Sequence, residues 1–193
     1  MRIIAGAHRG RALTPVGKGD AGAHLRPTTD RVRESLFNVL SGGRFDVEIE
    51  GAQVLDIFAG TGALGFEALS RGANHATFIE NGRVGQRLIQ ANGKLLGISD
   101  KMDLLRVDAT RVPTCPGNGA DLVFLDPPYG KKLGEKAIAT ALNQGWIAEG
   151  ALIVWEENAE IIPPDGLEFL DQRKYGDSRI NFLENQNPGK PEL

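Results

Sequence analysis

Four consecutive residues, Asp126-Pro127-Pro128-Tyr129, follow an apolar run and carry the strongest chemical signal in the chain. An exocyclic amine on a nucleic-acid base is a poor nucleophile, because its lone pair is delocalised into the ring. Transfer of a group to that nitrogen therefore needs acceptors that hold its N–H groups in place. The Asp126 carboxylate and the Pro127 carbonyl are such acceptors, the prolines make the backbone rigid, and Tyr129 offers a ring face on which a planar base can stack. These four residues are our candidate catalytic site for chemistry at the amino group of a base.

A glycine-rich stretch, DIFAGTGALG over residues 56–65, contains the spacing G-x-G-x-x-G at the end of a predicted strand. Gly60 and Gly62 let the backbone turn tightly and approach a ligand, while the helix that follows offers free N–H donors. The glycines alone indicate a nucleotide-like cofactor of either the NAD or another type. Asp56 narrows the choice, because a carboxylate there suits an ammonium or sulfonium group and repels a pyrophosphate. The candidate cofactor contacts in this stretch are Asp56, Phe58, Ala59, Gly60, Thr61 and Gly62.

Further acidic residues follow the next predicted strands. Glu80 closes the second strand 20 positions after Gly60, where an acid can accept hydrogen bonds from both hydroxyls of a ribose. Asp108, with Ala109 beside it, ends the third strand and could receive an adenine amino group, although a helix or loop cap is an open alternative. Asp126 is counted with the cofactor contacts as well, because it ends the fourth strand.

The positions of these residues require strands that alternate with helices. Apolar runs predict strands over residues 54–58, 75–79, 102–107, 120–125, 151–155, 167–174 and 179–183, and helical spacing predicts helices over about 63–71, 84–96 and 132–144. Strands that alternate with helices form parallel sheets, and the last two strands, joined by YGDS, suggest an antiparallel hairpin. The fold class is therefore α/β: a Rossmann-like, doubly wound, mostly parallel seven-stranded sheet with a C-terminal antiparallel hairpin and a small N-terminal β/helix extension.

The N-terminal segment differs from the rest of the chain in charge. Residues 1–45 hold eight Lys and Arg against three acids, although the net charge of the whole chain is −3. A basic segment on an acidic body is expected where that segment meets phosphates. We predict a hairpin plus a helix that begins near Asp30 and packs through Val32, Leu36, Val39 and Leu40. The candidate RNA contacts are Arg9, Arg11, Arg26, Arg31 and Arg33.

The chain divides into an extension over residues 1–45, a sheet domain over 46–185 and a frayed tail over 186–193. Its 193 residues, 41% hydrophobic and 24% charged, are typical of a single globular domain. The apolar runs are too short for a membrane helix, and the N-terminus has no export signal, so we expect a cytoplasmic protein. The single cysteine, Cys115, excludes an internal disulfide and a zinc cluster. No metal is expected, and we expect a monomer.

The sequence resembles S-adenosylmethionine-dependent methyltransferases of class I, and within them the bacterial RsmD-type 16S rRNA guanine-N2 methyltransferases. The resemblance rests on MRIIAGAHRGRAL, LRPTTDRVRESLFNVL, VLDIFAGTGALGFEALSRGA, FIE, VDAT, DLVFLDPPYG and YGDSRINFL. It implies S-adenosylmethionine as cofactor, with Asp56, Gly60 and Gly62 around its methionine part, Glu80 at the ribose, Asp108 near adenine and residues 126–129 at the target base. It also implies methylation of one guanine near position 966 of 16S rRNA in the small ribosomal subunit.

Two segments depart from the family pattern. NGRVGQ after Glu80 has glycines where helix formers are expected, and a glycine-rich linker predicted over residues 17–23 contains a short insertion around Lys18 to Ala23 that could alter the substrate side. Three other functions remain open from the residues alone. The same cofactor could serve another RNA or DNA base or a protein glutamine amide, the glycine loop could bind NAD in an oxidoreductase, and the basic segment could belong to a non-catalytic RNA-binding module.

Overall fold

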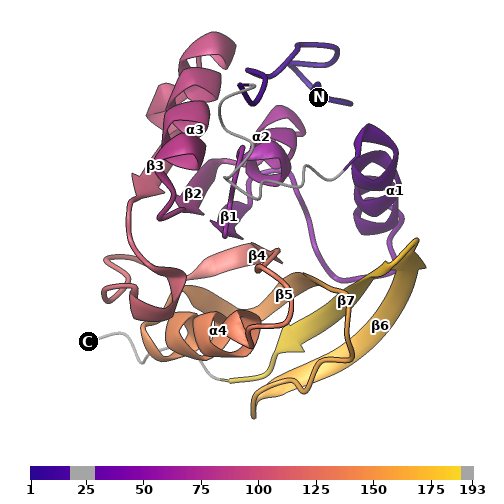
Figure 1. Ribbon diagram of the computed structural model, residues 1–193. Coiled ribbons are helices and arrows are strands. Elements are labelled where there is room, and N and C mark those ends of the chain that lie inside the picture. Colours follow the sequence, from indigo (N-terminus) through magenta and orange to yellow (C-terminus); the bar gives the residue numbers. More distant parts are fainter. Residues whose placement is uncertain (18–28, 188–193) are drawn as a thin grey trace.

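The carboxyl ends of five parallel strands lie along one edge of a seven-stranded sheet in the computed structural model, which describes residues 1–17 and 29–187 (Figure 1). The strand order is β3-β2-β1-β4-β5-β7-β6. The strands are β1 (Gln53–Ile57), β2 (His75–Ile79), β3 (Met102–Leu105), β4 (Ala120–Leu125), β5 (Ile147–Glu157), β6 (Leu167–Tyr175) and β7 (Ser178–Asn185). β7 pairs antiparallel with β5 and β6, while the other neighbours pair parallel. The predicted fold class is confirmed.

Helices cover both faces of this sheet (Figure 1). α1 (Asp30–Leu40), α2 (Ala63–Ser70) and α3 (Arg83–Leu96) lie on one face, and α4 (Leu133–Asn143) lies on the other; η2 (Ser99–Lys101) and η3 (Ala109–Arg111) are short 3₁₀ turns. Alternate residues of β4 enter opposite cores, with Leu122 and Phe124 on the α1–α3 side and Val123 and Leu125 on the α4 side. Burial on both faces explains why the central strands read as continuous apolar runs.

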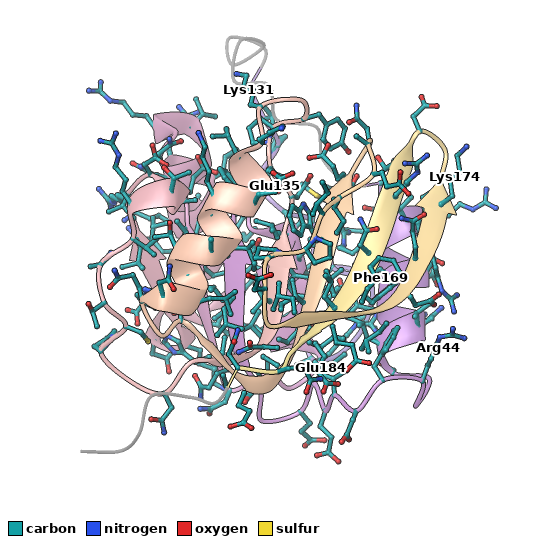
Figure 2. All side chains as sticks on the ribbon, turned by 90° about the horizontal axis from the view of Figure 1, so that it is seen from below. Arg44, Lys131, Glu135, Phe169, Lys174 and Glu184 are labelled. Atoms are coloured by element: carbon teal, nitrogen blue, oxygen red, sulfur yellow. The ribbon has the colours of Figure 1, made fainter. Side chains whose placement is uncertain are left out.

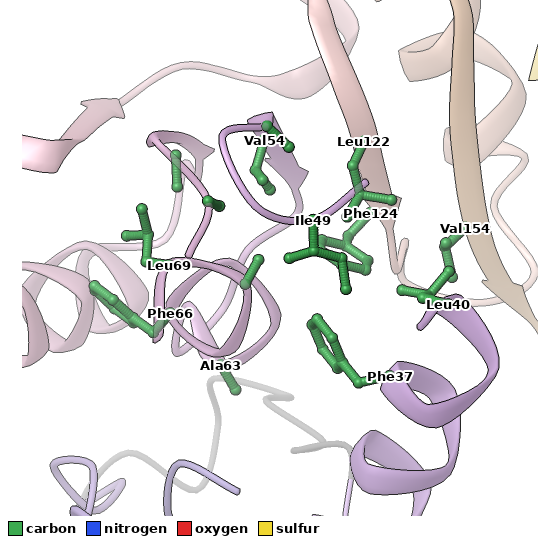
Figure 3. Packing of buried hydrophobic residues seen from close by; sticks show 14 of the residues in the cluster. Phe37, Leu40, Ile49, Val54, Ala63, Phe66, Leu69, Leu122, Phe124 and Val154 are labelled. Atoms are coloured by element: carbon green, nitrogen blue, oxygen red, sulfur yellow. The ribbon is translucent and has the colours of Figure 1, made fainter. Parts of the chain in front are cut away.

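The N-terminal helix α1 packs into the larger of these cores (Figure 3). Leu36 and Leu40 are buried, and Val32 and Val39 pack against the same cluster from partly buried positions, as the helical spacing predicts. Phe37 lies on this face as well, with its ring centroid 5.7 Å from that of Phe124. α1 is therefore fixed to the sheet by aromatic and aliphatic packing.

The first residues form a loop closed by a few antiparallel hydrogen bonds rather than a full hairpin. Arg2 and Ala12 form an isolated bridge, and the Ile3 N–H donates to the Arg11 carbonyl over 2.9 Å. Ile3 and Leu13 are buried in the α1–α3 core. The predicted extension over residues 1–45 thus shares a core with the sheet. Of the predicted glycine-rich linker and tail, residues 18–23 and 188–193 lie outside the described residues.

β5 extends beyond its prediction at both ends and reaches Glu157. Its charged end pairs with β7 through Glu156–Ile180 and Glu157–Arg179. Backbone hydrogen bonds continue the strand there, although the side chains are no longer hydrophobic. This extension brings two acidic side chains to the edge at which the parallel strands end. None of the helices in residues 1–17 and 29–187 combines the length and apolar character that a bilayer-spanning segment requires.

Candidate active site

The structure brings the predicted acidic residues to one edge of the sheet. Ile57, at the end of β1, pairs with Ile79 of β2 and with Leu125 of β4, so the residues that follow these two strands, Glu80 and Asp126, flank the end of β1 on either side. The strand order reverses between β1 and β4, because β2 and β3 lie on one side and β4 and β5 on the other. Ligands of open α/β sheets bind at such a switch point.

The loop after β1 has the backbone conformation that a close approach to a ligand requires. Phe58 has φ 59°, and Gly60 and Gly62 have φ 56° and 75°. A left-handed conformation at a non-glycine residue costs about 1–3 kcal/mol, and such strain is found at functional sites. A Cβ atom at Gly62 would lie 2.7 Å from the Phe66 ring, and one at Gly65 would lie 2.4 Å from the Phe78 ring. The loop therefore needs glycine at residue 62, and the first turn of α2 needs it at residue 65.

Glu80 holds this loop against the start of α3. Its Oε2 accepts a hydrogen bond from the Gly60 N–H over 2.8 Å, and its Oε1 accepts one from the Gly82 N–H over 2.6 Å. The side chain is half-buried, so it is not an isolated strand-end carboxylate in solvent. Each carboxylate oxygen can accept a second hydrogen bond, so Glu80 retains acceptor capacity toward ribose hydroxyls.

Gly85, which sequence analysis could only report as a departure, has a physical explanation. It lies in the first turn of α3, and a Cβ atom there would lie 2.7 Å from the Gly60 carbonyl oxygen and 2.8 Å from Cγ of Glu80. The glycine lets α3 approach the loop and the acid together. The signal that could have identified its role is its place in the first turn of the helix that follows a strand-end acid.

We predict that Gly85→Ala weakens cofactor binding by about tenfold or more, because the added methyl group must push Glu80 or the Gly60 peptide out of place. Isothermal titration calorimetry measures the affinity of each variant for the cofactor. Gly117→Ala is the matched control, since a Cβ atom at Gly117 meets no atom within 4 Å. Equal affinities of the two variants would show that the approach of α3 to the loop is not needed for binding.

Two buried or half-buried carboxyl groups lie at the switch point with raised pKa values. Asp56 is 3% exposed, and burial raises its pKa to about 8, against the opposing effect of the Gly65 N–H, which donates to Oδ2 over 3.0 Å. Burial raises the pKa of Asp126 well above its usual range, and Glu156, Asp56 and Glu157 raise it further. Mutually repelling carboxyl groups favour a cationic ligand among them.

Tyr129 is oriented by two residues that sequence analysis did not identify. Its hydroxyl donates to Oε1 of Glu156 over 2.9 Å and lies 2.9 Å from Oγ of Ser178. Burial raises the pKa of the Tyr129 hydroxyl, so it stays protonated as a donor. In the same loop Pro127 is buried and Pro128 is exposed. The last residues of β5 and the first residue of β7 thus fix the ring that could receive a base.

Asp108 has the capping role that the sequence left open. It is exposed, and its Oδ1 accepts hydrogen bonds from the N–H and the hydroxyl of Thr110, both over 2.8 Å, at the start of η3. These two hydrogen bonds lower the pKa of Asp108. Ala109 beside it is buried. A contact of Asp108 with adenine stays a prediction.

The predicted RNA contacts separate into exposed and buried arginines. Arg9, Arg11 and Arg31 are exposed, and Arg26 lies outside the described residues. The prediction for Arg33 is wrong, because its side chain is 0% exposed. It lies 2.9 Å from Asp30 and 3.7 Å from Glu67, and it donates to the Arg2 carbonyl.

The position of Arg33 follows from helical geometry. Residues 33, 36, 37 and 40 share one face of α1, and all four are buried. Arg33 is therefore placed in the protein core, where its side chain does not reach an RNA phosphate.

Comparison with known proteins gives consistent matches over nearly the whole chain. A family model described as conserved hypothetical protein 95 matches residues 1–184. Ribosomal RNA small subunit methyltransferase D of Escherichia coli K12 is 44% identical over 161 residues, which are 83% of this chain and 76% of that protein. The protein of the same name from Haemophilus influenzae is 37% identical over 181 residues, 91% of this chain and 89% of that protein.

Solved structures agree with these sequence matches. The structure of yhhF from Escherichia coli superposes with a TM-score of 0.81 at 37% identity, covering 96% of this chain and 98% of that one. A protein from Thermus thermophilus superposes with a TM-score of 0.70 at 28% identity, covering 94% of this chain and 98% of that one.

Proposed function

The chain belongs to the protein family described as conserved hypothetical protein 95, and from that membership and the geometry at the strand ends we propose that it methylates the exocyclic N2 of one guanine of 16S rRNA with S-adenosylmethionine. The observation that carries the proposal is the convergence of the glycine loop, Glu80 and the Asp126–Tyr129 loop at the switch point of the sheet. The guanine near position 966 is the proposed target.

The donor set at this edge fits S-adenosylmethionine. A sulfonium and an ammonium group favour the ionised forms of Asp56 and Asp126, whose pKa values are raised by burial and, to a smaller extent, by neighbouring carboxyl groups. Glu80 suits the ribose, and the left-handed backbone at Gly60 and Gly62 lets the loop over residues 58–62 turn tightly at the end of β1. A pyrophosphate, as in NAD, would add negative charge to a cluster of carboxyl groups. When bound, the cofactor supplies a methyl group made electrophilic by its positive sulfur.

The remaining steps depend on residues of this chain. In the proposed arrangement the Asp126 carboxylate and the Pro127 carbonyl accept the two N–H groups of the guanine amine, which orients its lone pair. Tyr129, held by Glu156 and Ser178, stacks on the base. Methylation makes the nitrogen acidic, so its proton leaves readily and no strong base is needed. The protein therefore contributes orientation more than proton transfer.

Incubation with cofactor labelled at its methyl group and with undermethylated small ribosomal subunits tests the activity. We expect label in 16S rRNA that ribonuclease releases as methylated guanosine. Label that remains in protein after ribonuclease treatment would contradict the proposal in favour of a protein amide. Stabilisation of the protein by NAD instead of S-adenosylmethionine in a thermal-shift assay would contradict the cofactor.

The raised pKa of Asp56, about 8, predicts a pH dependence of cofactor binding. A cationic ligand favours the ionised carboxyl group, so binding releases a proton at pH values below about 8. We compare the affinity for the sulfonium cofactor with the affinity for its thioether product, whose sulfur is uncharged. The ratio of these two affinities should rise between pH 6 and 8, by at most about tenfold per pH unit for each carboxyl group. Above about pH 8 the ratio should level off. Titrations of both ligands at several pH values measure this ratio. Asp56→Asn should flatten it, and a ratio independent of pH in the unaltered protein would contradict the account.

A further inference from the structure

A hollow of about 490 Å³ lies between α1, the residues that follow it and β6, on the side of the molecule away from β3. Most of its lining residues are charged or polar, and they come from segments far apart in the sequence. Residues of α1 and the following turn supply Arg31, Glu34, Ser35, Asn38, Val39, Gly42 and Arg44, and β6 supplies Arg173. Figure 2 shows Arg44 and Lys174 at this edge of the sheet. The C-terminal hairpin therefore adds positive charge beside the N-terminal helix.

A second hollow of about 410 Å³ continues along the other side of α1. It is lined by the N-terminal loop and α1: Arg2, Ile3, Ile4, Arg9, Gly10, Asp30, Arg31 and Glu34. Arg31 and Glu34 line both hollows, so the two hollows are neighbours on the surface of α1. Together they present five arginines and two acids, on a chain whose net charge is −3.

Asp171 pairs with the two arginines that the sequence analysis did not select and offsets part of their charge. Its Oδ2 lies 3.1 Å from Nε of Arg44 and 3.5 Å from Nε of Arg173. One carboxylate between two guanidinium groups leaves a net positive charge. Side-chain exposure is 55% for Arg44 and 37% for Arg173. Both can reach a ligand in the hollow.

The turn between β6 and β7 connects this surface to the candidate active site. On one side the Tyr175 hydroxyl lies 3.0 Å from Oγ of Ser35 in α1. On the other side Oγ of Ser178 lies 2.9 Å from the hydroxyl of Tyr129. A strand of nucleic acid that follows α1 past Arg173 therefore arrives at the loop that holds the target base.

We propose that Arg44 and Arg173 bind phosphates of the RNA strand, which runs along α1 from the N-terminal loop to the Tyr129 loop. This inference rests on the proposed function and deepens it, because it places an RNA contact on the C-terminal hairpin, outside the basic N-terminal segment. Several guanidinium groups that line neighbouring hollows fit a ligand that carries several phosphates, such as the backbone of a nucleic acid.

The test measures binding of an unmodified 16S rRNA transcript as a function of salt concentration. The double variant Arg44→Gln/Arg173→Gln should bind at least about tenfold more weakly at low salt, and the slope of log K against log salt should fall by about 0.7–0.9 for each lost contact. The matched control removes two exposed lysines near β3, at the opposite edge of the sheet, as Lys94→Gln/Lys101→Gln. The control should keep the slope of the unaltered protein.

A third variant separates RNA binding from a structural role. Asp171→Asn breaks the same ion pairs but leaves both arginines, so the proposal predicts tighter binding and a steeper slope. The proposal would be overturned if the arginine variant and the lysine control had the same slope of log K against log salt. Weaker RNA binding by the Asp171→Asn variant would overturn it as well. If the unaltered protein methylates rRNA while the arginine slope is unchanged, only the RNA path fails; if no RNA is methylated, the proposed function fails with it.

Discussion

Replacement of Asp126 by alanine is expected to lower the rate of methyl transfer by about 10²- to 10⁴-fold while cofactor affinity changes by less than about tenfold. The reason is that the carboxylate orients the attacking amine, a contribution made mainly in the transition state. Single-turnover assays with labelled cofactor measure the rate, and calorimetry measures the affinity. The half-buried position of Asp126 at the end of β4, beside Ile57, puts its carboxyl group at the switch point.

Asp126→Asn refines this prediction. The amide keeps the shape of the side chain but replaces one acceptor oxygen with a donor, so transfer should remain strongly impaired. Asp100→Asn, on the exposed turn before β3, is the control and should retain full activity. An Asp126→Ala variant that transfers methyl groups at near the original rate would show that another group orients the amine.

The second large effect concerns stability. Glu67 in α2 is 0% exposed and accepts hydrogen bonds from the N–H groups of Ile4 over 2.7 Å and Ala5 over 3.0 Å. It also pairs with Arg71 over 2.8 Å and lies 3.7 Å from Arg33. Glu67→Ala removes the acceptor of two backbone N–H groups and one of the two carboxylates that neutralise the buried Arg33 guanidinium, so the free energy of unfolding should fall by about 3–5 kcal/mol. Urea unfolding measures this change.

Two variants support the interpretation of that result. Glu67→Gln keeps one acceptor and should lose less stability than Glu67→Ala, while Glu48→Ala, at a surface position, should change the free energy of unfolding by less than about 0.5 kcal/mol. A loss below about 1 kcal/mol for Glu67→Ala would mean that water replaces the carboxylate and that the N-terminal loop is not held by it.

The sequence predicted the central strands and the acids at their ends because both signals are local. A buried parallel strand needs an uninterrupted apolar run, and the residue after it must lie at the carboxyl edge of the sheet. The predicted strand over residues 75–79 and that over 120–125 coincide with β2 and β4. The glycines of the loop were recognisable for the same reason, since their role depends on spacing within one turn.

The features that sequence analysis missed depend on contacts between distant segments. Arg33 was assigned to the surface by its charge, but Asp30 and Glu67 neutralise it inside the core. The contacts of Tyr129 with Glu156 and Ser178 arise only when β5 and β7 pair beyond their apolar centres. Such partners cannot be read from spacing along one segment.

The most direct test of the account is mass mapping of nucleosides in 16S rRNA from cells with and without this protein. The account predicts one N2-methylguanosine, near position 966, that is present only when the protein is present and that is lost when Asp126 is replaced by alanine. A methyl group on a ring nitrogen would contradict the role of the Asp126 carboxylate and the Pro127 carbonyl, which hold an exocyclic amine. A methyl group on the exocyclic amine of adenine would contradict the assignment to guanine, and 16S rRNA that is identical with and without the protein would contradict the whole account.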